Sequence, residues 1–249
     1  MSGHSKWATI KRKKEATDTK RSNMYAKLLR AVEVAAREGG GTIDANMTLA
    51  SAVEKAKSFS VPGDNIERAI KRGTGELGDG QRYEEVVYEG YAPGGIALLV
   101  EALTDNRNRT AQEIRHAFTR NNGNLGESGV VAWQFTRKGV IVVEKAVAPD
   151  EERLLEIALE SGAEDLRDSE SSWDVVTAPS DFTTVRAALE AAGITISSSD
   201  LSMEPQSSIP VDGSEAAQVL RLIEALEDLD DVQNVYANFD IPEEVMASL

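Results

Sequence analysis

The residues Gly139-Val140-Ile141-Val142-Val143-Glu144-Lys145 open the part of the chain whose order of elements decides the fold. Their β-branched run predicts a strand. The sequence that follows predicts a helix, two strands, a second helix and a last strand, at residues 149–161, 163–168, 173–177, 181–192 and 194–203. This order, βαββαβ, is the ferredoxin-like split arrangement. Residues 139–204 are therefore expected to form a complete α/β sandwich.

The segments on either side of this unit predict a second sandwich. Residues 82–136 contain, in order, strands at 83–88 and 96–103, a helix whose Thr110 and Glu113 have capping-box spacing, and a strand at 130–135. A helix at 214–229 and a strand at 232–239 follow the inserted unit, and this pair has too little surface to stand alone. Residues 82–136 and 209–240 are therefore expected to form one discontinuous domain, with 139–204 inserted.

Three short helices are predicted before the first strand. The first runs from Arg21 to Gly39, where three glycines stop it; the second starts near the cap Asn46; the third follows Pro62 and ends at Gly73. The predicted fold class is therefore α+β. A small N-terminal helical domain, residues 1–75 with its basic arm, precedes two ferredoxin-like α/β sandwich domains, one inserted into the other.

Composition excludes several classes of site and membrane segment. The chain of 249 residues has no cysteine, so disulfides, thiolate zinc sites and cysteine nucleophiles are excluded. The apolar run Ile96 to Val100 is too short to cross a bilayer, and no apolar stretch follows the basic N-terminus as in a secretory signal. A cytoplasmic protein without a membrane partner is expected.

Charge is divided unevenly along the chain. Residues 1–75 hold 15 Lys and Arg against 8 Asp and Glu, whereas the remainder holds 12 against 34. Seven of the cations stand around Trp7 in the first 21 residues, a combination suited to phosphates and to stacking on a base. The alternative is a solvated tail. The asymmetry favours a nucleic-acid-facing end and an acidic remainder that limits non-specific binding.

The sequence gives no support for catalysis. The two histidines, His4 and His116, lack carboxylates at metal-ligand spacing, and no Gly-x-Ser-x-Gly elbow is present. We expect a non-enzymatic protein with no cofactor, metal or small-molecule substrate. A secondary anion site is predicted at Arg107 and Arg109, at the start of a predicted helix. The alternative for these two arginines is ion pairing with neighbouring carboxylates.

Several long segments resemble the YebC/PmpR family. They are Gly3 to Trp7, Asp64 to Gly73, Tyr88 to Gly95, Thr104 to Thr110 and Asp230 to Tyr236. The resemblance implies three domains, one helical and two α/β, with one α/β domain inserted into the other. Bacterial members are described as probable transcriptional regulators that bind promoter DNA. Mitochondrial relatives resemble translational activators, and bacterial relatives have been linked to ribosomes stalled on proline-rich peptides.

The resemblance also implies which residues face nucleic acid. Carried over by position, the candidates are Lys6, Trp7, Lys11, Arg12, Lys13, Lys14, Lys20 and Arg21, and the weaker candidates are Lys27 and Arg30 on the following helix. This chain departs from the family where Asn-Pro-Arg-Leu-Arg is common, because it has Asn46-Met47-Thr48-Leu49-Ala50. Gly63 stands where a lysine is common. The arm is therefore expected to carry more of the electrostatics here.

The leading expectation is a non-enzymatic regulator of gene expression that binds DNA through the basic arm. No stripe of base-reading Arg, Asn and Gln is visible on one helix, so a translation factor bound to ribosomal RNA is the alternative. A third possibility is an adaptor whose acidic α/β domains dock on a basic protein. A monomer is favoured.

Overall fold

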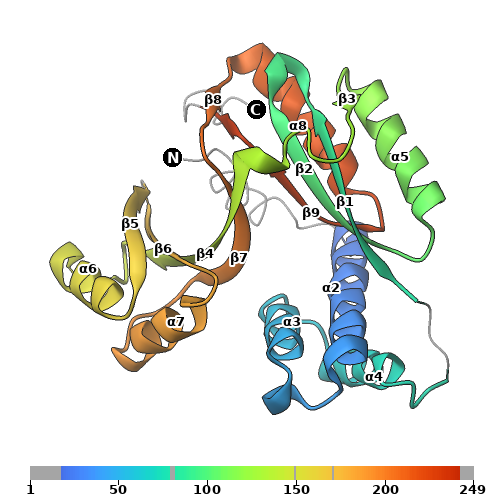
Figure 1. Ribbon diagram of the computed structural model, residues 1–249. Coiled ribbons are helices and arrows are strands. Elements are labelled where there is room, and N and C mark those ends of the chain that lie inside the picture. Colours follow the sequence, from blue (N-terminus) through green and yellow to red (C-terminus); the bar gives the residue numbers. More distant parts are fainter. Residues whose placement is uncertain (1–17, 79–81, 149, 170, 242–249) are drawn as a thin grey trace. The chain divides into compact units, whose positions relative to one another are not determined.

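A computed structural model describes residues 18–78, 82–148, 150–169 and 171–241 of the chain (Figure 1). The helical part consists of α2 (Asp18–Gly39), α3 (Met47–Ser58) and α4 (Gly63–Gly73), with a 3-10 turn at Ile43–Ala45. Its core is small and aliphatic, with Val32, Leu49 and Ile66 almost fully buried. Asn46 caps α3 as predicted, accepting the N–H of Leu49 at 3.0 Å.

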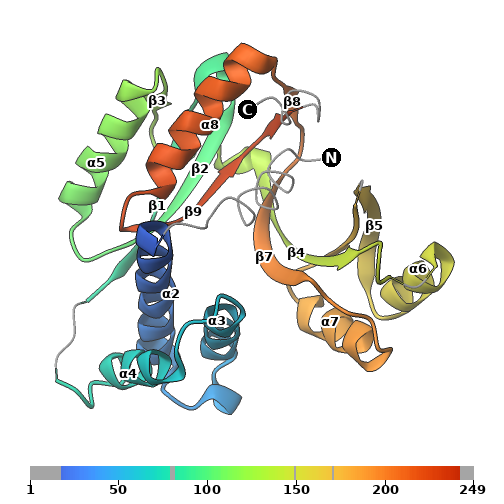
Figure 2. The same cartoon turned by 180° about the vertical axis from the view of Figure 1, so that it is seen from behind.

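The first sheet has the strand order β3-β1-β2-β9 and is antiparallel throughout. Its strands are β1 (Glu84–Tyr91), β2 (Ala97–Thr104), β3 (Asn124–Leu125) and β9 (Val232–Ala237). Strand β2 is central and apolar, and it pairs with the late strand β9, so distant parts of the sequence share one sheet (Figures 1 and 2).

Two helices, α5 (Arg107–Arg120) and α8 (Gly213–Glu227), contact each other and complete this sandwich. Phe118 of α5 and Leu222 of α8 are fully buried. A Cβ placed on Gly123 would lie 2.8 Å from a terminal methyl of Leu222 and 3.0 Å from the carbonyl oxygen of Tyr91, so glycine allows the close approach at the end of α5.

The second sheet has the strand order β5-β6-β4-β7, which is the ferredoxin-like order for four strands taken in sequence. Its strands are β4 (Phe135–Glu144), β5 (Ala163–Ser169), β6 (Ser172–Thr177) and β7 (Ser198–Pro205). Helices α6 (Glu151–Glu160) and α7 (Phe182–Ala191) pack on its apolar face around Ile141, Val175 and Leu189. Two short strands, β8 (Ile209–Pro210) and β10 (Phe239–Asp240), pair separately.

The structure confirms the predicted fold class and corrects one local expectation. Residues 130–135 do not form a strand: a 3-10 turn occupies Ala132–Gln134 and β4 begins at Phe135. Helix α5 begins before the Thr110 and Glu113 pair, with Arg107 and Arg109 in its first turn as expected, because the Asn106 side chain caps it by accepting the N–H of Arg109 at 3.1 Å.

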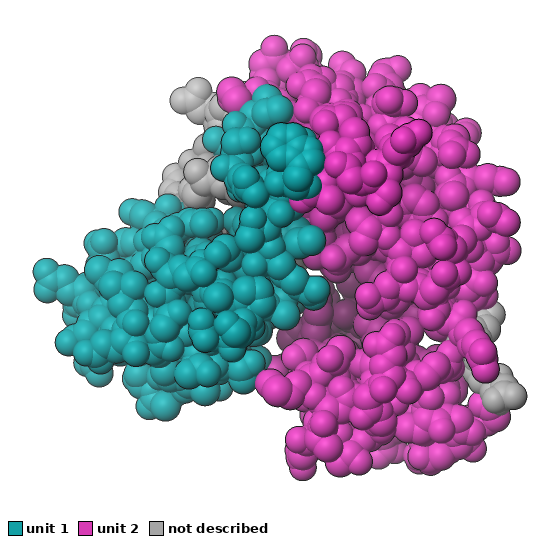
Figure 3. All heavy atoms as spheres, viewed as in Figure 1, with its two compact units in different colours: residues 1–5, 133–209, 238–240 teal, residues 6–132, 210–237, 241–249 magenta. Residues whose placement is uncertain are grey.

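The chain divides into two compact units (Figure 3). One contains residues 133–209 and 238–240, and therefore the inserted sandwich. The other contains the described residues up to Ala132 together with 210–237 and Ile241, so the helical part and the discontinuous sandwich group together. The finer division into three domains, with boundaries at 1–75, 82–136 plus 209–240, and 139–204, stays a prediction.

Candidate nucleic-acid interface

Most of the predicted contacts belong to the arm. Lys6, Trp7, Lys11, Arg12, Lys13 and Lys14 lie outside the described residues, as does the side chain of Lys20. Arg21 is described and exposed, in the first turns of α2. Because α2 begins at Asp18, Arg21 lies where the arm joins the helical part.

Arg30, predicted as a weaker contact, is held within the protein. Its Nη1 donates to the carboxylate of Asp231 at 3.0 Å, and to the carbonyl oxygens of Asp230 at 2.8 Å and Leu103 at 3.2 Å. Its guanidinium also lies over the ring of Tyr83, 4.9 Å from the centroid. Arg30 therefore ties α2 to the ends of β2 and β9.

Lys27, the second weaker candidate, lies one turn before Arg30 on α2. Its side chain is buried, and its Nζ donates to the carbonyl oxygen of Glu227 at the end of α8. A cation at a helix C-terminus is favoured by the helix dipole. Lys27 and Arg30 thus both connect helix α2 of the helical part to the discontinuous sandwich.

Asp231, the carboxylate that pairs with Arg30, accepts several donors, and only 3% of its side chain is exposed. Besides Arg30, it accepts hydrogen bonds from Arg109 Nη2 at 2.6 Å and from the Thr110 hydroxyl at 2.6 Å. Burial on its own would raise the pKa of Asp231. The hydrogen bonds from Arg109 and Thr110, with the charges of Arg109 and Arg30, outweigh burial and lower this pKa below its usual value.

The two arginines of the predicted secondary anion site have different surroundings. Arg109 pairs with Asp231 and with Asp105, at 2.6 and 2.8 Å, so the structure gives it two carboxylates. Arg107 lies 3.9 Å from Glu84, and both side chains are more than half exposed. An exposed ion pair of this kind contributes little to the stability of the fold, because water and salt screen the attraction between its charges.

Glu89 organises a loop that sequence reasoning missed. It is buried, and its carboxylate accepts the backbone N–H groups of Gly129, Val131 and Ala132 at 2.7 to 2.8 Å. Burial would raise its pKa, but the three backbone hydrogen bonds more than offset burial and lower it. The only sequence signal was its place in the Tyr88 to Gly95 segment.

Further exposed cations lie on α3 and α4: Lys57, Arg68 and Lys71. On each helix these cations lie outside the stripe of buried apolar residues. This amphipathic spacing is the sequence signal that could have identified them. Lys57 and Lys71 also stand in last turns, where the helix dipole alone favours cations. At the point of departure from the family, Met47 is 67% exposed, so an apolar side chain occupies that surface.

Across the described ranges, no group of three His, Cys, Asp or Glu side chains is placed to hold a metal ion, and His116 is exposed. No helix in the described part of the chain is long and apolar enough to span a membrane.

Comparison with known proteins gives matches along nearly the whole chain. A family model described as the TACO1/YebC protein N-terminal domain matches residues 5–76, and one described as the TACO1/YebC second and third domain matches residues 83–239. A Rubrobacter xylanophilus protein named "Probable transcriptional regulatory protein" is 59% identical over 100% of this chain and 99% of its own length. A Geobacter sulfurreducens protein with the same description is 54% identical over the full length of both.

A solved structure is also similar to this chain. The crystal structure of a conserved hypothetical protein from Aquifex aeolicus is 48% identical, with a TM-score of 0.82. The match covers 92% of this chain and 94% of that one.

Proposed function

The chain belongs to the TACO1/YebC family, and from this premise we propose that it is a non-enzymatic, cytoplasmic regulator of gene expression that binds nucleic acid through its basic N-terminal arm. Two full-length relatives carry the name of a probable transcriptional regulatory protein, so DNA is the proposed partner. The contacts are the six arm residues from Lys6 to Lys14 named above, with Lys20 and Arg21.

One observation carries this proposal. The chain has a formal charge of −15, yet residues 1–75 hold 15 Lys and Arg against 8 Asp and Glu. Within residues 1–75, Lys27 and Arg30 donate to acceptors inside the protein. The cations proposed to meet phosphate are therefore those before α2 and in its first turns, and Lys27 and Arg30 are left out of the proposal.

The alternative partner is RNA, as in a translation factor bound to the ribosome. A basic arm with one aromatic contacts phosphates and stacks on a base without needing a recognition helix. Such an arm fits folded RNA as well as it fits duplex DNA.

The deciding experiment compares three labelled probes of equal length by fluorescence anisotropy at one salt concentration: a promoter DNA duplex, an unrelated DNA duplex, and an RNA hairpin with an unpaired loop. Tighter binding to promoter DNA than to unrelated DNA and to the hairpin supports the transcriptional role. Preference for the hairpin moves the proposal to the translational role. If no probe is bound, the transcriptional and the translational roles are both contradicted, and the protein-interaction adaptor is the remaining hypothesis.

The location of the site is tested by changing Lys11, Arg12, Lys13 and Lys14 to alanine. The matched control removes the same charge from exposed arginines elsewhere, at Arg115, Arg120, Arg137 and Arg221. The arm variant is expected to lose most of its affinity, and the control to keep it. Equal losses would show that total charge, and not the arm, governs binding.

A further inference from the structure

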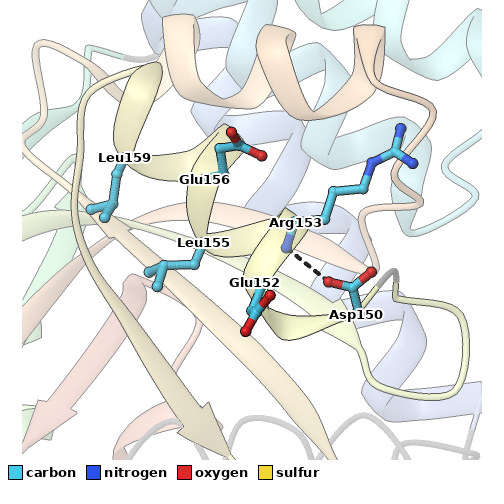
Figure 4. Close-up of a pocket in the computed structure, with 6 residues that line it drawn as sticks. All are labelled: Asp150, Glu152, Arg153, Leu155, Glu156 and Leu159. Carbon is cyan, nitrogen blue, oxygen red and sulfur yellow. Dashed lines mark hydrogen bonds between the residues drawn. The ribbon is translucent and has the colours of Figure 1, made fainter.

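The outer side of helix α6 carries two exposed leucines in the inserted sandwich. Leu155 and Leu159 are 36% and 49% exposed and lie one turn apart, whereas Leu154 and Ala158 on the inner side are fully buried. Figure 4 shows the two leucines projecting to the same side of the helix, along a shallow surface hollow that they line with Asp150, Glu152, Arg153 and Glu156. Helix α6 therefore presents an apolar strip to the outside as well as to the core.

Carboxylates surround this strip, and Arg153 is the one cation among the residues that line the hollow with them. Glu152, Glu156 and Glu160 are exposed, and none of them has an ion-pair partner among the described residues. Glu152, in the first turn, is favoured by the helix dipole, but Glu156 and Glu160 lie toward the C-terminus, where the dipole opposes negative charge. Stabilisation of the helix by its dipole therefore accounts for Glu152 but not for Glu156 and Glu160.

The charge of the surrounding unit restricts what could cover the strip. Residues 133–209 hold 15 Asp and Glu against 6 Lys and Arg. Nucleic acid and anionic lipid are repelled by such a surface. Exposed apolar side chains rimmed by one sign of charge fit an apolar partner rimmed by the opposite sign. The complementary occupant is therefore a cationic protein segment.

We propose that the outer side of α6 is a docking site for a basic amphipathic segment of another protein. Two apolar side chains of the partner, at helical spacing, pack on Leu155 and Leu159, and flanking Lys or Arg side chains pair with Glu152 and Glu156. This site is separate from the arm and does not depend on nucleic-acid binding. The protein thereby joins a nucleic acid to a basic protein.

The test titrates a labelled synthetic 14-residue peptide of Leu and Lys, with Leu at helical spacing, with the full-length chain. Two double variants are expected to weaken binding at least tenfold: Leu155→Ser with Leu159→Ser, and Glu152→Gln with Glu156→Gln. Matched controls in the same unit are Leu201→Ser, which changes a leucine that is 39% exposed, and Glu144→Gln with Glu190→Gln. The controls are expected to bind within twofold of the unchanged chain. Thermal melts confirm that every variant folds.

Three outcomes would overturn the proposal. Losses as large in the controls as in the α6 variants would mean non-specific attraction to an acidic protein. Concentration-dependent dimerisation that the leucine variants abolish would mean that a second copy occupies the strip. Tighter peptide binding after alanine substitution of Lys11 to Lys14 would mean that the chain's own arm competes for it.

Discussion

Asp231 joins three parts of the molecule at a single carboxylate. It accepts hydrogen bonds from Arg30 of α2, from Arg109 and Thr110 of α5, and from Thr104 at 3.2 Å at the end of β2. Removing one member of a buried charged network leaves the other members without partners, which costs more than the net value of the contact. The residue therefore governs how firmly the helical part is held.

The substitution Asp231→Asn tests this role. An amide keeps the shape but loses the charge, and its NH2 group would face donors, so we expect a loss of about 2 kcal/mol in the free energy of unfolding. Urea denaturation measures it. Asp230 is the matched control, because its side chain is exposed and only its carbonyl oxygen contacts Arg30. Equal stability of Asp231→Asn and Asp230→Asn would contradict the role.

The buried Glu89 predicts a pH dependence. Its pKa is lowered in the folded state, so the stability that it contributes is complete above the unfolded value of about 4. That stability is lost as pH falls through the folded pKa, because protonation removes an acceptor of three N–H groups. Asp231 contributes with the same sign.

The check is the free energy of unfolding of the unchanged chain and of Glu89→Gln, measured from pH 7 to pH 3. The variant is expected to be less stable at pH 7 and to lose less stability on acidification. Glu85→Gln, an exposed position on the same strand, is expected to follow the unchanged chain. Parallel curves for Glu89→Gln and the unchanged chain would exclude Glu89 as a source of the slope.

Among the secondary elements, α4 meets α2 through a glycine. A Cβ on Gly73 would lie 2.3 Å from the carbonyl oxygen of Glu33 and 2.8 Å from the Cβ of Ala36. Backbone cannot yield as a flexible side chain does. The close approach of the two helices therefore requires Gly73, whereas Gly63, at the start of the same helix, has open space around it.

We expect Gly73→Ala to lower the free energy of unfolding by about 1 to 3 kcal/mol through overpacking. Gly63→Ala is expected to be neutral, or to stabilise by up to about 1 kcal/mol, because alanine restricts the unfolded chain without a clash. Thermal and urea denaturation of the two variants measure the difference. A Gly73→Ala protein as stable as Gly63→Ala would show that the helices separate easily.

Elements were predicted from sequence where local pattern alone defines them. The helices and strands of the inserted sandwich follow apolar periodicity, and Asn46 marks the start of α3. The strand predicted at 130–135 does not form. The N–H groups of Val131 and Ala132 donate to the carboxylate of Glu89, more than forty residues earlier, and not to a neighbouring strand. No local pattern reports such a distant acceptor.

The same limit applies to the candidate site. Sequence alone could locate the cations of α2. It could not show which of them pair within the protein, because Lys27 donates to Glu227 and Arg30 to Asp231, about two hundred residues away. For Arg109 the ion-pair alternative could be stated from the sequence, yet Asp231 could not be named as the partner.

For the whole molecule, the proposed function rests on a division of charge. The basic end is proposed to bind a polyanion, and the acidic remainder limits binding elsewhere on the surface. This account makes the arm the source of the counterion release that accompanies nucleic-acid binding.

The most direct measurement is the slope of the logarithm of the binding constant against the logarithm of salt concentration, for a DNA duplex. Each lost phosphate contact reduces this slope by about 0.9 on duplex DNA. The variant with alanine at Lys11, Arg12, Lys13 and Lys14 is therefore predicted to have a slope smaller by about 3 to 4. The control with alanine at Arg115, Arg120, Arg137 and Arg221 is predicted to keep the original slope. An arm variant with the slope of the unchanged chain would contradict the account.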